Sequence, residues 1–323
     1  MKRYDVIIIG AGPIGLRCGI EAVTRKKSYL VIEKGCLVNS LYNYPTNMTF
    51  FSTSERLEIG EVPFVSHGDK PTRRESLEYF RRVSESWKLN VNTYETVKNI
   101  EGEKNNFIVR TDRGEYSGGN VIIATGFYDR PNLMNIPGEK LPKVHHYFRE
   151  AHPYAYHKLI IVGAGNSAVD VALETYHRGS GVTMVIREDK LKDSVKYWVK
   201  PDLENRIKEG AIKAYFNSEL TEIREKEADI KTPEGIVTVQ NDFVFAMTGY
   251  RPDFDFLADA GLHFSDDRAR TPQFDERTFE TNRKGIYLAG VVCGGMETGK
   301  WFIENSRDHA VNIFDNIEKV IGK

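Results

Sequence analysis

The chain is poor in cysteine and has no long apolar run. Among its 323 residues only Cys18, Cys36 and Cys293 are cysteines, and they form neither a Cys-x-x-Cys pair nor a metal-ligand spacing. No apolar segment approaches the ~20 residues of a membrane-spanning helix. The first expected strand begins directly after Lys2 and Arg3, which leaves no room for a signal peptide. These absences predict a metal-free protein of the reducing cytoplasm that does not enter a membrane.

The charge balance also excludes one class of partner. A net charge of −1 gives no electrostatic reason to expect nucleic acid or an anionic membrane as a partner. A hydrophobic fraction of 40% and a charged fraction of 28% are typical of a globular protein, and the length favours two domains over one.

A glycine-rich fingerprint stands near the N-terminus, where GAGPIG occupies residues 10–15 and follows the apolar run 6–9. Gly10 permits a tight turn, Gly12 lets the backbone approach a pyrophosphate, and Gly15 lets helix and strand pack closely. The free N–H groups at the helix start would bind the phosphates. Glu33 ends the next expected strand, where a carboxylate accepts hydrogen bonds from ribose hydroxyls and repels a 2′-phosphate. This pattern favours FAD or NAD over NADP.

A second fingerprint, GAGNSA at residues 163–168, follows the apolar run 159–162. Its third glycine is replaced by Ala168, which the motif permits. Arg187 ends the next expected strand, and a guanidinium there can pair with a 2′-phosphate, with Lys190 and Lys192 nearby. The second site therefore favours NADPH.

The order of these units predicts an α/β protein with two Rossmann-like dinucleotide-binding domains, the second inserted into the first. Expected crossings near Phe127 and Arg251 give a discontinuous first domain at residues 1–126 and 252–323 and a second at 127–251. Two dinucleotides in one chain suggest a flavin that exchanges electrons with a nicotinamide.

Several further residues are candidates for these sites. The segments 124–126 and 247–249 end buried strands in a small residue and a glycine, so their backbone could approach a nucleotide. A final helix expected from Lys300 to Ile321 could present Lys300 or Trp301 to the flavin. No catalytic acid, base or nucleophile stands out, and the catalytic residues stay unknown. Cys18, one turn into the first helix, is a weak candidate for a redox thiol.

With these features placed, the chain resembles the low-molecular-weight thioredoxin reductase superfamily, and within it the bacillithiol disulfide reductase family. Three stretches carry this resemblance: NYPTNMTFFS at 43–52, KYWVKPD at 196–202 and KWFIENSR at 300–307. The resemblance implies FAD in the first site, NADPH in the second, a cytoplasmic bacterial homo-oligomer, and reduction of a low-molecular-weight disulfide or a small redox protein.

The motifs and the resemblance together give two sets of expected contacts. FAD is expected to contact Gly10, Gly12, Pro13, Ile14, Gly15, Glu33, Lys34, Asn43, Val97, Ala124, Thr125, Gly126, Gly290, Val291, Lys300 and Trp301. NADPH is expected to contact Gly163, Gly165, Asn166, Ser167, Arg187, Lys192, Thr248 and Gly249.

The chain departs from the family patterns at three places. It lacks the Cys-x-x-Cys of thioredoxin reductases, so that relay to thioredoxin is absent. Ile14 stands where bacillithiol disulfide reductases often have a cysteine, and Val291 stands where thioredoxin reductases have an aspartate. Alternative functions are therefore a ferredoxin- or flavodoxin-NADP reductase, a flavin monooxygenase, and a non-catalytic flavin redox sensor.

Overall fold

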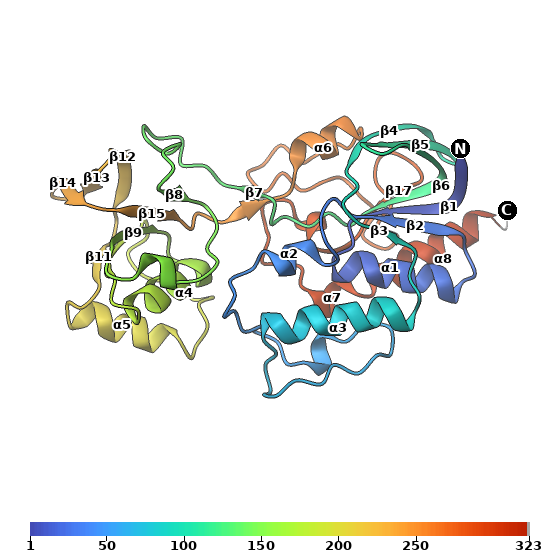
Figure 1. Cartoon of the computed structure of the whole chain (residues 1–323). Coiled ribbons are helices and arrows are strands. Elements are labelled where there is room, and N and C mark those ends of the chain that lie inside the picture. Colours follow the sequence, from blue (N-terminus) through green and yellow to red (C-terminus); the bar gives the residue numbers. More distant parts are fainter. Residues whose placement is uncertain (322–323) are drawn as a thin grey trace. The chain divides into compact units, whose positions relative to one another are not determined.

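The computed structural model describes residues 1–321, which form two compact units. Unit 1 contains residues 1–130 and the C-terminal segment that begins at Tyr250, and unit 2 contains Pro131–Gly249. Each unit has its own hydrophobic core. The expected architecture of two Rossmann-like domains, one inserted into the other, is confirmed. Figure 1 shows the elements of both units.

Unit 1 is built on a seven-stranded sheet in the order β3-β2-β1-β6-β5-β4, with β17 also paired to β6. β1 runs parallel to β2 and β6, and β17 runs parallel to β6, whereas β4, β5 and β6 form an antiparallel meander. The strand bounds are β1 Lys2–Ile9, β2 Tyr29–Ile32, β3 Val91–Asn92, β4 Val97–Glu103, β5 Asn106–Thr111, β6 Glu115–Ile123 and β17 Ile286–Leu288. β1 and β2 read as nearly continuous apolar runs because both faces of the sheet are covered there.

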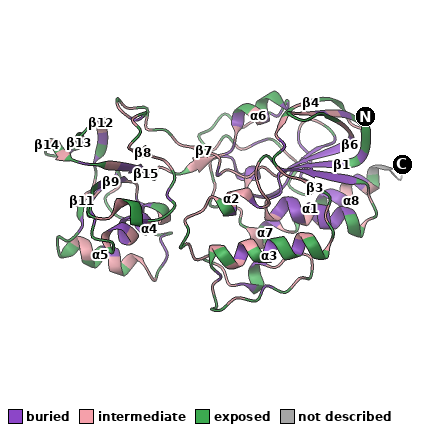
Figure 2. Cartoon of the chain, in the orientation of Figure 1, coloured by how far each residue is buried: buried purple, intermediate pink, exposed green. Residues whose placement is uncertain are grey.

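Helices and short 3-10 turns cover the sheet of unit 1. α1 begins at Pro13, where no backbone N–H is needed, and packs against α8 on one side of the sheet (Figure 1). α3 begins with a capping box between Thr72 and Glu75. The bounds are α1 Pro13–Thr24, α2 Asn39–Tyr42, η1 Glu55–Leu57, α3 Arg73–Ser86, α6 Phe254–Asp259, η3 Gly290–Gly294, α7 Ile303–Ser306 and α8 His309–Ile321. Figure 2 shows buried residues running through β1, β6 and the inner faces of α1 and α8.

Unit 2 contains a five-stranded parallel sheet in the order β11-β10-β9-β15-β8 and a three-stranded antiparallel sheet, β12-β13-β14. Its helices α4 and α5 pack against each other. The strand bounds are β8 Val144–His145, β9 Lys158–Val162, β10 Gly181–Val185, β11 Lys213–Tyr215, β12 Glu219–Ile223, β13 Glu227–Thr232, β14 Gly235–Gln240 and β15 Phe243–Ala246. The helical segments are η2 His152–Tyr154, α4 Asn166–Tyr176 and α5 Lys200–Lys208.

The two crossings of the chain run as a pair of short strands. β7 (Arg130–Pro131) pairs with β16 (Tyr250–Arg251), and the Arg130 guanidinium lies 2.8 Å from a carboxylate oxygen of Asp253. Asn132 adds a hydrogen bond from its N–H to the carbonyl oxygen of Gly249, 2.9 Å away. Both crossings are therefore ordered by backbone pairing.

The chain turns between β3 and β4, where Tyr94 adopts a positive φ of 56°. One expected element differs in the structure. The single final helix expected from Lys300 to Ile321 is two helices, α7 and α8, with Arg307 and Asp308 between them. Lys300 and Trp301 precede α7, so Trp301 does not begin the helix as expected.

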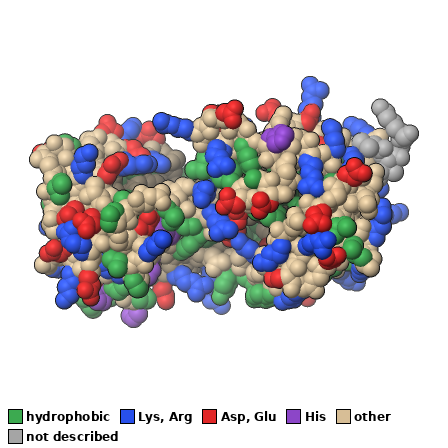
Figure 3. Space-filling view, turned by 90° about the horizontal axis from the view of Figure 1, so that it is seen from above, with side chains coloured by type: hydrophobic (Ala, Val, Ile, Leu, Met, Phe, Trp, Pro, Cys, Tyr) green, Lys and Arg blue, Asp and Glu red, His purple; other side chains and the backbone are tan. Residues whose placement is uncertain are grey.

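The surface carries charges of both signs. Acidic and basic side chains are interspersed over the face seen in Figure 3, in keeping with a net charge near zero. Within residues 1–321, no helix combines the length and apolar character that a membrane crossing requires.

Candidate functional site

The first fingerprint turn is held by close backbone contacts. Gly10 has a φ of 104°, and its N–H donates to the carbonyl oxygen of Ile32. A Cβ on Gly10 would lie 2.6 Å from the carbonyl oxygen of Ala124, and one on Gly15 would lie 1.8 Å from that of Gly10. Only glycine fits these two positions, because the turn, the start of α1 and the end of β6 touch through their backbones.

Gly12 differs from its two neighbouring glycines. It is the residue before α1, and its φ of −69° and ψ of 176° suit any residue. A Cβ there would meet no atom within 4 Å. The open space in front of the helix N-terminus is thus a cradle that a side chain would fill, and the unpaired N–H groups and partial positive charge of the helix face it. The cradle fits a pyrophosphate.

Glu33 lies beside this cradle, at the end of β2, and is 6% exposed. Its carboxylate accepts hydrogen bonds from the N–H of Ala11 at 2.8 Å and from the N–H of Gly35 at 2.9 Å. Burial raises the pKa of the Glu33 carboxyl, and the two backbone donors oppose that shift. The two bonds fix the carboxylate beside the fingerprint turn, and each oxygen keeps a lone pair for a ribose hydroxyl.

The other expected flavin contacts of unit 1 gather around the same turn. A Cβ on Gly126 would lie 3.9 Å from Val291, and one on Gly290 would lie 3.2 Å from Ile14. The ends of β6 and β17 therefore meet the start of α1. The hydroxyl oxygen of Thr125 is buried and makes no hydrogen bond within residues 1–321. A buried orphan hydroxyl at this edge is the kind of group that a ligand satisfies.

Five expected flavin contacts lie further along the same unit. Lys34 forms an ion pair with Asp129 at 2.7 Å, and the backbone carbonyl of Asn43 accepts a hydrogen bond from Tyr128. Val97 begins β4, two residues after Glu95, whose N–H donates to the carbonyl of Glu33. A Cβ on Gly294 would lie 3.4 Å from Trp301 and 4.0 Å from Lys300, so both residues border the turn η3.

The second fingerprint repeats the turn with one change. Gly163 has a φ of 132°, and a Cβ there would lie 2.5 Å from the carbonyl oxygen of Met247. Gly165 precedes α4, and the nearest atom to a Cβ on it would be in Lys192, at 4.0 Å. Ala168 occupies the third position and is buried. The start of α4 therefore fits an anion, as the start of α1 does, and Lys192 lies beside it.

Hydrogen bonds attach the loop that carries Lys192 to the start of α4. The Lys192 N–H donates to the carbonyl of Ala164, and the Asn166 side chain bonds the backbone of Ser194 and Lys196, at 3.0 and 2.8 Å. These bonds fasten the loop after β10 to the helix start. Arg187 and Ser167 are exposed, so their side chains are accessible to a ligand.

Thr248 and Gly249 make contacts that the sequence did not indicate. The Thr248 hydroxyl donates to the carbonyl oxygen of Asn132, and the Gly249 carbonyl accepts from the Asn132 N–H. Both residues thereby fasten the return crossing to the first one. Their expected contact with NADPH stays a prediction.

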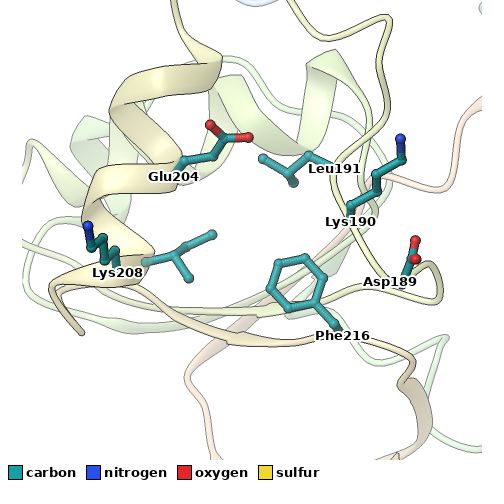
Figure 4. Close-up of a pocket in the computed structure, with 7 residues that line it drawn as sticks. Asp189, Lys190, Leu191, Glu204, Lys208 and Phe216 are labelled. Carbon is teal, nitrogen blue, oxygen red and sulfur yellow. The ribbon is translucent and has the colours of Figure 1, made fainter.

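A surface pocket of about 230 Å³ lies in unit 2, between the loop after β10 and α5. Leu191, Ile207 and Phe216 form its apolar part, and the labelled carboxylates and ammonium groups stand around it (Figure 4). None of the expected NADPH residues lines it. It is below the ~300 Å³ that ligand pockets usually reach, and we do not assign it a role in binding.

The three cysteines are not activated. Cys18 is fully buried in α1, and burial raises the pKa of its thiol to about 12. Burial also raises the thiol pKa of Cys293, which is 1% exposed, and of the half-buried Cys36. A reactive cysteine is normally exposed and has a depressed pKa, so these properties argue against a redox role for Cys18.

Sequence reasoning missed one buried polar residue beside Gly290, at the expected flavin site. His309 begins α8, is 2% exposed, and accepts a hydrogen bond from the N–H of Gly290 at 3.2 Å. The signal was its place on the apolar face of the helix, four residues before Ile313 and eight before Ile317.

Comparisons with known proteins agree with this geometry. The family model described as pyridine nucleotide-disulphide oxidoreductase matches residues 7–290. The bacilliredoxin reductase Bdr of Bacillus subtilis (strain 168) is 44% identical over 321 residues, which cover 99% of each chain.

Two solved structures resemble the whole chain. The bacillithiol disulfide reductase Bdr (YpdA) from Bacillus cereus has a TM-score of 0.96 at 40% identity and covers 99% of this chain and 100% of its own. Its counterpart from Staphylococcus aureus has a TM-score of 0.95 at 38% identity and covers 100% of this chain and 99% of its own. The predicted resemblance is confirmed, and it implies the use of a flavin and a pyridine nucleotide. The chain is an oxidoreductase and belongs to the pyridine nucleotide-disulphide oxidoreductase family.

Proposed function

We propose that the chain binds FAD in unit 1 and NADPH in unit 2 and reduces a low-molecular-weight disulfide, with bacillithiol disulfide as the first substrate to test. NADPH, a proton and the disulfide R–S–S–R would give NADP⁺ and two thiols R–SH. A bound flavin supplies the two-electron step between the nicotinamide and the disulfide. The substrate class follows the names of the relatives.

The observation that carries the flavin assignment is the cradle at Gly12 with Glu33 beside it. The α1 N-terminus would bind the pyrophosphate through its backbone N–H groups, and Gly12 would allow its approach. Glu33 would accept hydrogen bonds from the ribose of the adenosine half. Its negative charge would repel a 2′-phosphate, which favours FAD over NADPH in this unit.

The choice of NADPH for unit 2 rests on charge. Arg187 follows the end of β10 by two residues, where unit 1 has the carboxylate of Glu33 after β2, and Lys192 lies beside the α4 N-terminus. A guanidinium binds a phosphate through two parallel hydrogen bonds, so the 2′-phosphate of NADPH has a partner that NADH would not use. The exposed Ser167 could add a hydroxyl to the same site.

A small redox protein is the second candidate acceptor, because the Bacillus subtilis relative is named a bacilliredoxin reductase. The proposal also includes a homo-oligomer in the bacterial cytoplasm, as the resemblance implied. A ferredoxin or flavodoxin acceptor, a flavin monooxygenase and a redox sensor are the alternatives for the same cofactors.

The test begins with the purified full-length chain. We expect a yellow protein with one FAD per chain. In the absence of oxygen, NADPH should bleach the flavin absorbance, and bacillithiol disulfide should restore it. A colourless chain that does not take up added FAD would overturn the cofactor assignment. Reoxidation by a ferredoxin or flavodoxin in one turnover, with none by the disulfide or by a bacilliredoxin, would favour the alternative acceptors instead.

A further inference from the structure

His309 occupies a buried position beside the turn that carries expected flavin contacts. Gly290 follows the end of β17 and has a φ of 84°. The Ala289 N–H donates to β6 at Ile123, and the Gly290 N–H, one residue later, donates to Nδ1 of His309 at 3.2 Å. The imidazole therefore satisfies the first donor that leaves the sheet at this point.

The same ring nitrogen also lies near the other end of the turn. Sγ of Cys293 is 3.9 Å from Nδ1, and both Gly290 and Cys293 belong to η3. On its far side, Gly290 is so close to α1 that a Cβ would lie 3.2 Å from Ile14. The turn is thus held between His309 and a residue of the first fingerprint.

Aromatic rings fix the orientation of the imidazole. Phe279 stacks on it with ring centroids 3.9 Å apart, and Trp301 meets it edge to face at 4.5 Å. Burial lowers the pKa of His309 to about 4, so the ring is neutral at pH 7. Because Nδ1 accepts the Gly290 hydrogen, the proton of the neutral ring must be on Nε2.

Two N–H donors of this cluster have no acceptor in the described part of the chain. Nε2 of His309 and Nε1 of Trp301 are both buried and make no hydrogen bond within residues 1–321. Native proteins rarely leave a buried donor unsatisfied without a ligand, ion or water to receive it. This observation is independent of the Gly290 contact, and it points to a ligand beside the turn.

We infer that His309 is a positioning residue, which holds the turn Gly290–Gly294 in the conformation that receives the flavin. The role rests on the proposed function, since Gly290 and Val291 are expected flavin contacts. Without an acceptor at Nδ1, the Gly290 N–H would be buried and unpaired, and the turn would relax toward another partner. The largest effect would then be on flavin binding.

The test compares three variants of the full-length chain. His309→Phe keeps an aromatic ring but removes the acceptor, and His309→Asn restores an acceptor oxygen close to the Nδ1 position. The matched control is Asn316→Leu, because Asn316 also lies on α8 and donates to the Tyr287 hydroxyl of β17 at 3.1 Å, away from the turn. The readouts are FAD affinity, the absorption spectrum of bound flavin, and the thermal stability of the apo chain.

We expect His309→Phe to weaken FAD binding about tenfold, the effect of one lost buried hydrogen bond, and to change the shape of the flavin spectrum. His309→Asn should recover most of the affinity. Asn316→Leu should lower the stability of the apo chain about as much as His309→Phe does, while its FAD affinity and flavin spectrum stay as in the wild type. If His309→Phe does not fold, His309→Leu replaces it as the variant without an acceptor. A loss of FAD affinity in His309→Leu, with wild-type affinity and spectrum in His309→Asn, would support the same conclusion.

Two results would overturn the inference. One is wild-type FAD affinity and spectrum in a folded variant that lacks the acceptor, His309→Phe or His309→Leu. The other is an equal loss of FAD from Asn316→Leu, which would make the effect one of general stability. Both differ from failure of the proposed function, in which the wild-type chain itself would not bind FAD.

Discussion

The two fingerprint turns are built alike but differ in how closely helix and strand approach. Gly10 and Gly163 both have a positive φ, and a Cβ on either would collide with a carbonyl oxygen of the neighbouring strand. At the third position a Cβ on Gly15 would lie 1.8 Å from the Gly10 carbonyl oxygen, whereas Ala168 carries its Cβ and is buried. α1 therefore starts closer to its turn than α4 does.

The residues that follow the second strand differ in charge and exposure. Unit 1 has Glu33, a buried carboxylate fixed by two backbone N–H groups. Unit 2 has the exposed Arg187 after an apolar Ile186. The carboxylate of unit 1 is thus fixed in a position that fits ribose hydroxyls. The guanidinium of unit 2 is accessible and fits an additional phosphate. The four predictions below test these differences.

The largest effect is expected from Gly15→Ala. A Cβ at 1.8 Å from a backbone oxygen forces the turn or the helix to move, and we expect a loss of about 3 kcal/mol or more in unfolding free energy. Urea unfolding followed by circular dichroism measures it. The matched change in unit 2, Ala168→Gly, removes a methyl group from a helix that already fits it, and should cost about 1 kcal/mol. Equal losses in the two variants would show that the helices start at the same distance from their turns.

Gly12→Ala should separate binding from stability. The added Cβ meets no atom of the chain, so the apo stability should stay within about 1 kcal/mol of the wild type. The methyl group would fill the pyrophosphate cradle, and we expect FAD affinity to fall at least about tenfold, or 1.4 kcal/mol. Flavin content and thermal melting of the apo chain measure the two quantities.

The control for Gly12→Ala is Gly165→Ala, which makes the same change in front of α4. It should leave FAD content unchanged and raise the KM for NADPH. Retention of FAD by Gly12→Ala, with a normal spectrum, would contradict the placement of the pyrophosphate at α1.

Much of this comparison could be predicted from the sequence. The residues around 10–15 and 163–168 fix the turns locally, because only glycine allows the positive φ and the close backbone contacts. The apolar runs before them fix the central strands, and the capping box fixes the start of α3. These features depend on neighbours in sequence, so a single sequence reveals them.

The contacts between distant segments could not be predicted in this way. The Gly290–His309 bond and the Thr248–Asn132 bond depend on how strand ends meet loops far away in the chain. The division of the last helix into α7 and α8 has no glycine or proline at the break to reveal it. Tyr94, which turns the chain between β3 and β4, is an uncommon residue at positive φ.

Arg187→Ala tests the charge difference between the two sites. Its expected effect is smaller than those of Gly15→Ala and Gly12→Ala. Loss of a charged hydrogen-bond partner for the 2′-phosphate should raise the KM for NADPH about tenfold and leave the KM for NADH unchanged. Steady-state kinetics with both nucleotides measures this, with Lys231→Ala on β13 as a control of equal charge change. A parallel rise in both KM values would indicate that Arg187 does not distinguish the two nucleotides.

The smallest effect is expected from Cys18→Ala, and unit 2 shows why. Counted from the first glycine of each fingerprint, Cys18 corresponds to Val171 of α4, and both side chains are buried. A thiol at a position where the sister helix has valine, with a pKa raised to about 12, acts as a small apolar core residue. Turnover should stay within about twofold of the wild type, since no transition-state contact is lost, and stability should fall by about 1 kcal/mol.

The half-buried Cys36 is the control for Cys18→Ala, because Cys36→Ser removes the more accessible thiol. If neither change affects turnover, disulfide reduction proceeds without these two thiols, and Cys293, which is also buried with a raised pKa, is the remaining cysteine. If Cys18→Ala abolishes turnover while FAD stays bound, α1 must open during the reaction to expose the thiol. The close contacts of Gly15 and Gly10 would then have to break in each cycle, although no equivalent opening is needed in α4. The Cys18 result therefore decides whether the tight start of α1 is a fixed frame for the flavin or a moving part of the reaction.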